Sequence, residues 1–295
     1  MIKINITLKG LFLLFLALVS CFTKAQDSNE DIIIATGRLG GAYHATGLKI
    51  CHLIEKYSHR KCTALPTKAS LDNIKLLQEG YVDFGFTQED HLYTEISKQP
   101  DELDKKINIR PIEPVLHLYP EYLMILVKKD GSIQDFYDLC GVKIGANSII
   151  STSSALLNIF EDKSFKVKPR LQKLTTKRIG MKLCEETFDA VAVFSGYPSV
   201  FFEDISKLCS INVLSIPNEF TKKIAKDNHV YKQSSLEFAG SKINTVHTDS
   251  VLAARSDIDR EKISVIRKII RKYFDEFKAS HNLLRNLEKS DVFRD

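Results

Sequence analysis

A glycine-containing turn near the start of the chain has the residue types of an anion-binding site. The turn spans residues 37–41, ends in Gly40 and Gly41, and is followed closely by Tyr43. It lies between an apolar strand predicted over residues 31–35 and a helix predicted from about Tyr43. Glycine lets the backbone approach a ligand closely. The first N–H groups of a helix lack intrahelical partners and carry partial positive charge. We therefore expect this turn to bind a carboxylate or phosphate, with the Tyr43 hydroxyl as a further donor.

A second turn repeats this arrangement after the next strand. A strand predicted over residues 62–65 leads to Thr67 and Lys68, and Ser70 is predicted to be the N-cap of the following helix. Asn73 lies one helical turn further, where it would contact the ligand or brace the loop. Ser70 and its neighbours are therefore expected to bind the same anion as the first turn.

Polar residues also follow a third strand, predicted over residues 81–86. Gln88 and Asp90 stand just beyond it. Ligands of open α/β sheets bind at the carboxyl ends of the strands, so both residues are expected to line a cleft. Asp90 would accept a hydrogen bond from an ammonium group or orient neighbouring donors.

The order of the predicted elements indicates two α/β lobes. Strands and helices alternate from residue 31 to about residue 121, a hydrophobic strand over residues 122–128 then crosses to a second alternating region, and residues 246–254 return. We predict lobe 1 to comprise residues 26–122 plus 243–295 and lobe 2 residues 123–242. The mature length of about 270 residues suits two lobes. The two crossing strands would join two mixed sheets and act as a hinge.

The linked spacing of these motifs resembles the TAXI family, the substrate-binding subunits of tripartite ATP-independent periplasmic (TRAP) transporters. The pattern runs through Gly40-Gly41-x-Tyr43, Thr67-x-x-Ser70-x-x-Asn73 and Gln88-x-Asp90, and the similarity covers nearly all of the mature chain. The resemblance implies a two-lobed periplasmic binding protein of the type II-like class. It further implies capture of a small anionic solute, an amino acid such as glutamate or an organic acid, for the integral-membrane subunits of a TRAP transporter. No cofactor is implied, and we expect a monomer.

In the second lobe the resemblance assigns Ser148, Ser151 and Tyr197 to the ligand. Ser148 begins a Ser-Ile-Ile sequence where the family has Gly-Ser-Gly, so the bare backbone of the usual turn is missing. Hydroxyl groups from Ser151 onward could replace it at the helix start. The first lobe departs from the family at Lys68, which either points to water or strengthens selection for an acidic ligand.

The N-terminus has the layout of a secretory signal. Lys3 and Lys9 precede an apolar core over residues 11–19, which is too short to span a membrane. Cleavage after Ala25 would release a soluble periplasmic protein and make residues 1–25 a signal peptide, the interpretation that we favour. A lipobox-like sequence that ends at Cys21 offers the alternative of a lipid anchor. Removing Lys3, Lys9 and Lys24 from the formal net charge of +5 leaves +2. This balance argues against nucleic-acid binding, which needs a strongly basic face.

Five cysteines remain besides Cys21, and disulfides are allowed in an exported protein. Cys51 and Cys62 bound a short loop that could close, and proteins that resemble this chain often carry cysteines at both places. Cys184 and Cys209 flank a strand-helix unit and form the second expected pair. Cys140 would then stay unpaired as a small buried residue. The alternative, a metal site from Cys51 to Cys62 with the intervening histidines, matches no common zinc spacing.

The sequence contains no catalytic constellation. The segment around Ser195 is not Gly-x-Ser-x-Gly, the histidines form no His-Glu-x-x-His helix, and the first turn fits neither a P-loop nor a dinucleotide fingerprint. We therefore expect a binding protein and not an enzyme. Two rival functions are an exported enzyme on the same scaffold, which would need a reactive pair in the cleft, and a surface antigen that has lost transport.

Overall fold

We describe the protein from a computed structural model, which defines residues 31–98, 110–146, 155–156, 159–174 and 176–294. The predicted signal peptide over residues 1–25, with Cys21, and the expected ligand residues Ser148 and Ser151 lie outside the described residues. Ile32–Asp295 form one compact unit. Within the described part of the chain, no helix combines the length and the apolar character needed to cross a bilayer.

The unit is built on a mixed ten-stranded sheet with the path β2-β1-β3-β10-β4-β7-β5-β6, in which β8 also pairs with β4 and β9 with β10. The strands are β1 (Ile32–Ala35), β2 (Cys62–Leu65), β3 (Phe84–Gln88), β4 (Ile112–Lys128), β5 (Lys143–Ala146), β6 (Arg170–Lys173), β7 (Ala190–Ser195), β8 (Ile211–Val213), β9 (Lys232–Phe238) and β10 (Ser241–Arg255). β1 is parallel to β2 and β3, and β5 is parallel to β6 and β7. The fold is therefore α/β with a mixed sheet, as predicted.

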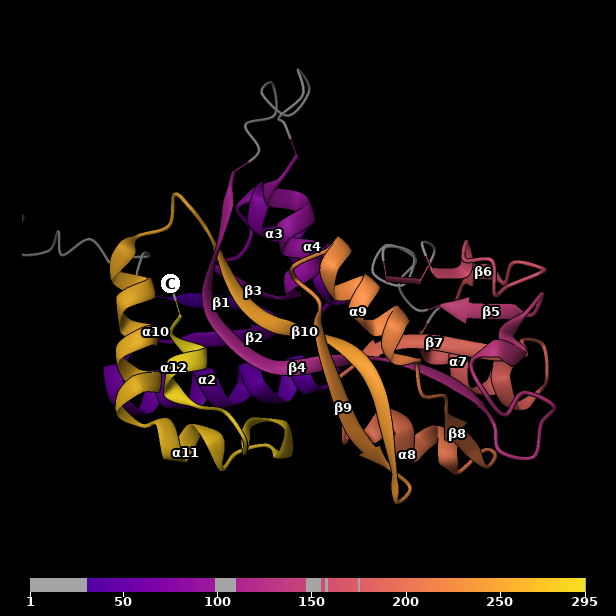
Figure 1. Ribbon diagram of the computed structural model, residues 1–295. Helices are drawn as coiled ribbons and strands as arrows, with labels where there is room; N and C mark the ends of the chain where they lie inside the picture. Colours follow the sequence, from indigo (N-terminus) through magenta and orange to yellow (C-terminus); the bar gives the residue numbers. More distant parts are fainter. Residues whose placement is uncertain (1–30, 99–109, 147–154, 157–158, 175, 295) are drawn as a thin grey trace, which may run out of the picture. The chain divides into compact units, whose positions relative to one another are not determined.

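The two long strands β4 and β10 connect the parallel strand groups, as the prediction of two crossing strands requires (Figure 1). The first part of β4 pairs antiparallel with β10, as far as Tyr122 opposite His247. From Tyr122 onward β4 pairs with β7, and β10 pairs with β9 up to His247. Because the crossing strands are shared, the two predicted sheets form one continuous hydrogen-bonded path. Both strands change partners at Tyr122 and His247. The lobe boundaries at 122/123 and 242/243 stay a prediction.

Helices cover the sheet and connect its strands. They are α2 (Ala42–Ser58), α3 (Ser70–Glu79), α4 (Glu89–Ile96), η1 (Tyr137–Leu139), α7 (Thr176–Cys184), α8 (Val200–Ser206), α9 (Asn218–Asp227), α10 (Arg260–Lys272), α11 (Phe274–Lys278), η2 (Asn282–Leu284) and α12 (Lys289–Val292). The Asp259 carboxylate caps α10 by accepting a hydrogen bond from the Glu261 N–H at 2.9 Å. The sequence pattern predicts one helix over residues 259–280, but a non-helical Tyr273 divides it into α10 and α11.

Separate apolar cores support the two strand groups. Next to β1–β3, residues of α2, α10 and α11 pack against Phe84 and Phe86, and these helices lie together in Figure 1. Beyond the change of partners, Phe136, Phe160 and Phe165 form an aromatic cluster under β5 and β7. Each strand group therefore packs on an apolar core of its own.

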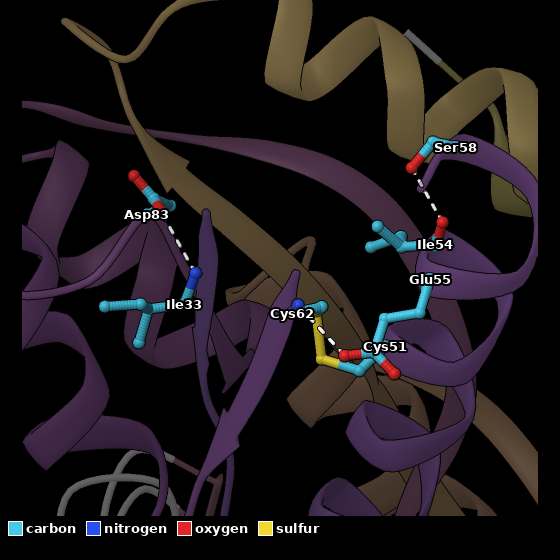
Figure 2. Close-up of a disulfide and its surroundings, with 7 residues drawn as sticks. All are labelled: Ile33, Cys51, Ile54, Glu55, Ser58, Cys62 and Asp83. Atoms are coloured by element: carbon cyan, nitrogen blue, oxygen red, sulfur yellow. Dashed lines mark hydrogen bonds between the residues drawn. A yellow bond between two sulfur atoms is a disulfide. The ribbon is translucent and has the colours of Figure 1, made fainter. Parts of the chain in front are cut away.

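The structure contains both expected disulfides. Cys51 in α2 joins Cys62 in β2, and Cys184 joins Cys209. Figure 2 shows the first bond together with Asp83, whose carboxylate accepts a hydrogen bond from the Ile33 N–H at 2.9 Å. Cys140 is unpaired but exposed, so the expectation that it would be buried was wrong. It lies at the end of η1, and its Sγ accepts a hydrogen bond from the Val167 N–H at 3.2 Å.

Candidate functional site

A cavity of about 240 Å³ lies where the turns before α2 and α3 face the end of β7. This volume is below the roughly 300–1,000 Å³ of sites for drug-sized ligands, so it suits a small solute. The lining residues are Gly37, Arg38, Gly40, Gly41, Ala42, Tyr43, Lys68, Ala69, Ser70, Gln88, Glu121, Val193, Phe194, Ser195, Gly196, Ser199, Val200, Phe201 and His281. Gly40, Gly41, Tyr43, Lys68, Ser70 and Gln88 belong to the predicted set.

The first turn places backbone donors at the cavity. Gly40 has a φ of 77°, a left-handed conformation that favours glycine, and Gly41 is the extended N-cap of α2. The Gly41 N–H donates a hydrogen bond to the Arg38 carbonyl oxygen at 2.9 Å, but no side chain caps α2, so the N–H groups of its first turn remain available to a ligand. The Tyr43 ring stacks on Phe86 at 5.3 Å, and its hydroxyl donates a hydrogen bond to Glu121 Oε2 at 3.2 Å.

The second turn differs from its predicted cap. Ala69, with a φ of 75°, is the N-cap of α3, so the prediction that Ser70 is the N-cap was wrong. Ser70 is the first helical residue, and its Oγ accepts a hydrogen bond from the Gln88 N–H at 3.2 Å. The Thr67 hydroxyl oxygen accepts one from the Ala69 N–H at 3.0 Å and so stabilises the unusual backbone. Lys68 is exposed on the cavity wall.

Asn73 lies beneath this turn and does not line the cavity. Its fully buried Nδ2 donates hydrogen bonds to the carbonyl oxygens of Thr36 at 2.5 Å and Phe86 at 2.7 Å, and its Oδ1 accepts one from the Thr67 hydroxyl at 2.6 Å. It therefore connects the ends of β1 and β3 to the second turn. The structure assigns bracing contacts to Asn73 and Thr67.

Asp90 also lies outside the cavity lining. Its carboxylate accepts hydrogen bonds from the His91 N–H at 2.8 Å and from the Tyr231 hydroxyl at 2.8 Å. Gln88, at the end of β3, lines the cavity. Of the two polar residues after the third strand, the structure thus brings only Gln88 to the other turn residues.

The opposite wall comes from the end of β7 and the start of α8. Ser195, Gly196 and Ser199 line the cavity there. Tyr197 does not, because its ring packs against Phe202 and Phe238 at centroid distances of 5.5 and 5.6 Å. His281 also lines the cavity, and burial lowers the pKa of its imidazole, which favours the neutral ring.

Glu121 is the functional candidate that sequence reasoning missed. It lies in β4 beside the change of partners, is 8% exposed and lines the cavity. Burial raises the pKa of its carboxyl to about 8, while its hydrogen bond with Tyr43 acts in the opposite direction. A sequence signal existed, because Glu121 is a lone acid inside the long and mainly apolar segment from Val115 to Val127.

A cluster of two acids and a histidine outside the cavity has the geometry of a metal site, but the guanidinium of Arg294 binds there. Ligand atoms of Glu89, His117 and Asp249 lie within 4.8 Å of one another. The Arg294 guanidinium donates hydrogen bonds to all three, at 3.2 Å to Glu89 Oε1, 2.7 Å to His117 Nδ1 and 2.5 Å to Asp249 Oδ2. Lys232 pairs with Asp249 at 2.8 Å. The cluster therefore anchors the segment after α12 to both crossing strands.

The fold and the cavity define the class: this is the α/β fold of periplasmic solute-binding proteins, with its cavity at strand ends beside the crossing strands. The chain belongs to the NMT1-like family, which matches residues 34–294.

Solved structures show the same fold. The arginine-, lysine-, histidine-binding protein ArtJ from Geobacillus stearothermophilus is similar with a TM-score of 0.56 at 13% identity, over 88% of this chain and 98% of that one. The substrate-binding protein of an amino acid ABC transporter has a TM-score of 0.53 at 15% identity, over 85% and 96%. The periplasmic aliphatic sulphonate-binding protein SsuA from Escherichia coli has a TM-score of 0.52 at 16% identity, over 88% and 80%.

Proposed function

We propose that this protein captures a small anionic solute, an amino acid such as glutamate or an organic acid, in the cavity between the turns before α2 and α3 and the end of β7. One observation carries the proposal. Two uncapped helix N-termini face one small cavity that the end of β7 and the start of α8 close from the other side. Backbone N–H groups at such termini favour a carboxylate.

The side chains of the cavity support an acidic ligand group at the turns. Arg38 and Lys68 are exposed on the wall and add positive charge next to the Gly40-Gly41 turn. The similar structures do not decide the charge of the ligand, since ArtJ is named for cationic amino acids and SsuA for a sulphonate. The preference must come from the lining of this chain.

A role in transport would require the protein to close around its solute, and contacts on both sides of the cavity would favour such a closed form. A solute that touches both strand groups favours a closed population, and the crossing strands β4 and β10 are the natural hinge. We propose lobes of residues 26–122 plus 243–295 and of residues 123–242, with Ser148, Ser151 and Tyr197 as additional contacts on closure. The change of partners of β4 at Tyr122 supports the first boundary, whereas β10 changes partners at His247, a few residues beyond the second.

The resemblance to the TAXI pattern supports a TRAP transporter as the membrane partner. The protein would be exported by residues 1–25, act as a monomer in the periplasm and dock in its closed form on the integral-membrane subunits. The ABC transporter named for one similar structure is the competing partner. Co-purification of the tagged protein with membrane subunits encoded beside it distinguishes the two, because an ABC partner brings a nucleotide-binding subunit and a TRAP partner does not.

The experiment on solute binding combines mass spectrometry with thermal shifts. Small molecules released from the purified mature protein are identified, and unfolding midpoints are measured with amino acids, keto acids and dicarboxylates. A true ligand raises the midpoint further at each higher concentration.

A pair of tryptophan substitutions controls this experiment. Val200→Trp narrows the cavity from a 55% exposed position and should abolish the shift, whereas Leu208→Trp, at a 56% exposed position outside the lining, should preserve it. Equal shifts in both variants would contradict the site. The absence of any stabilising small molecule would contradict solute binding and favour a surface antigen, and turnover of a solute would favour an enzyme.

A further inference from the structure

Glu121 adds an acidic group to a cavity that is also lined by the cations Arg38 and Lys68. Its carboxyl group lines the cavity wall, whereas Arg38 and Lys68 lie on the wall formed by the two turns. Among the described residues, no lysine or arginine forms an ion pair with Glu121; the nearby cations Lys232 and Arg294 pair with Asp249 instead. The buried carboxyl therefore has no countercharge from the surrounding protein in the described structure.

Burial opposes the ionisation of Glu121, and its polar neighbours act in both directions. Asp90 at the start of α4 and Asp249 in β10 repel a further negative charge. The Tyr43 hydroxyl from α2 donates a hydrogen bond to it, and Gln88 also favours the ionised form. Tyr119 is a further titratable group near Glu121, and Arg38, Lys68 and His281 line the same cavity.

We propose that Glu121 is the residue that selects an amino group: the solute places its carboxylate at the Gly40-Gly41 and Ser70 turns and its ammonium group against Glu121. On binding, Glu121 releases the proton that its carboxyl group holds without the solute. This inference rests on the proposed function. A protonated amine supplies the missing countercharge, so the carboxylate form becomes favourable only with this ligand in place. The proton passes to solvent, and no covalent bond changes.

The loss of a proton from Glu121 on binding predicts how the affinity for the solute depends on pH. With a carboxyl pKa of about 8, Glu121 is mostly protonated at pH 7, so about one proton leaves for each solute bound. Affinity for an amino acid should therefore rise about 50-fold from pH 6 to pH 8. A solute that needs the protonated carboxyl as a donor would show the reverse slope.

Calorimetry on the mature protein tests this proposal. The twenty amino acids are screened, and each one that binds is compared with its 2-keto analogue, for example L-glutamate with 2-oxoglutarate. Titrations at pH 6, 7 and 8 in buffers of different ionisation enthalpy count the protons released. We expect release of about one proton at pH 7, the 50-fold rise, and a keto analogue at least tenfold weaker than its amino acid.

Two variants assign the effect to one side chain. Glu121→Gln should lose the pH dependence and the preference over the keto analogue, while Glu113→Gln, in the same strand but outside the lining, should retain both. Proton uptake, a flat pH profile, equal binding of the keto analogue, or no binding of any amino acid would overturn the role of Glu121. Organic-acid binding that Val200→Trp abolishes would still uphold the proposed function, so the two failures are distinguishable.

Discussion

Replacing Asn73 should destabilise the protein strongly, because three buried hydrogen bonds depend on its amide. A typical intramolecular hydrogen bond contributes about 0.5–1.5 kcal/mol, so Asn73→Ala should cost about 2–4 kcal/mol of unfolding free energy. Asn73→Asp keeps the shape but directs a carboxylate at the carbonyl oxygens of Thr36 and Phe86. It should cost more than about 4 kcal/mol, because it buries an unpaired charge.

The assay is urea unfolding followed by circular dichroism, with thermal melts in parallel. A loss of 2–4 kcal/mol corresponds to a drop of roughly 5–15 °C in the melting temperature for a domain of this size. Asn286→Asp is the matched control, since Asn286 is exposed near the end of the chain. If Asn73→Asp and Asn286→Asp unfold at the same urea concentration, the bracing role derived for Asn73 is refuted.

Three further predictions concern the disulfides and the cluster around Arg294. Cys51→Ser and Cys184→Ser should cost about 2.8 and about 3.5 kcal/mol from the loop lengths of 11 and 25, and a larger loss for Cys51→Ser in urea unfolding would contradict this order. Burial and the neighbouring Arg294 lower the pKa of His117 to about 4, so the contribution of its neutral imidazole to folding stability is present above pH 6.5 and is lost as pH falls towards 4. The unfolding free energy of the wild-type protein should therefore fall by about 2 kcal/mol between pH 7 and pH 5, and His117→Gln should lack this decrease. Arg294→Gln should cost about 1.5–3 kcal/mol, because Glu89 loses its arginine partner while Asp249 keeps Lys232, and an unchanged urea midpoint would exclude the anchoring role.

The strand-turn-helix pattern predicted much of the fold and several cavity residues. Glycines at 40 and 41 and the apolar strands before each turn are local signals, and the structure places Gly40, Gly41 and Tyr43 around the cavity where that pattern indicated. The positions of the cysteines, together with the resemblance at Cys51 and Cys62, likewise predicted both disulfides. These features depend on residues close in sequence, where spacing carries enough information.

Features that depend on tertiary packing were harder to predict. Ser70 has the residue type of an N-cap, but the Thr67 hydroxyl stabilises a left-handed Ala69, which takes that position instead. Asp90 is directed to Tyr231, far along the chain, and not to the cavity. Glu121 lines the cavity beside the point where β4 changes partners, and this change is a property of strand pairing that no local spacing encodes.

A crystal structure of the mature protein, grown with the solute that mass spectrometry identifies, would show whether the two helix N-termini bind the acidic group of the solute. We expect solute density in the cavity, with the acidic group of the solute within hydrogen-bonding distance of the backbone N–H groups at Ala42 or Ser70. Solute bound elsewhere on the protein, or bound in this cavity with its acidic group turned away from both helix N-termini, would contradict it.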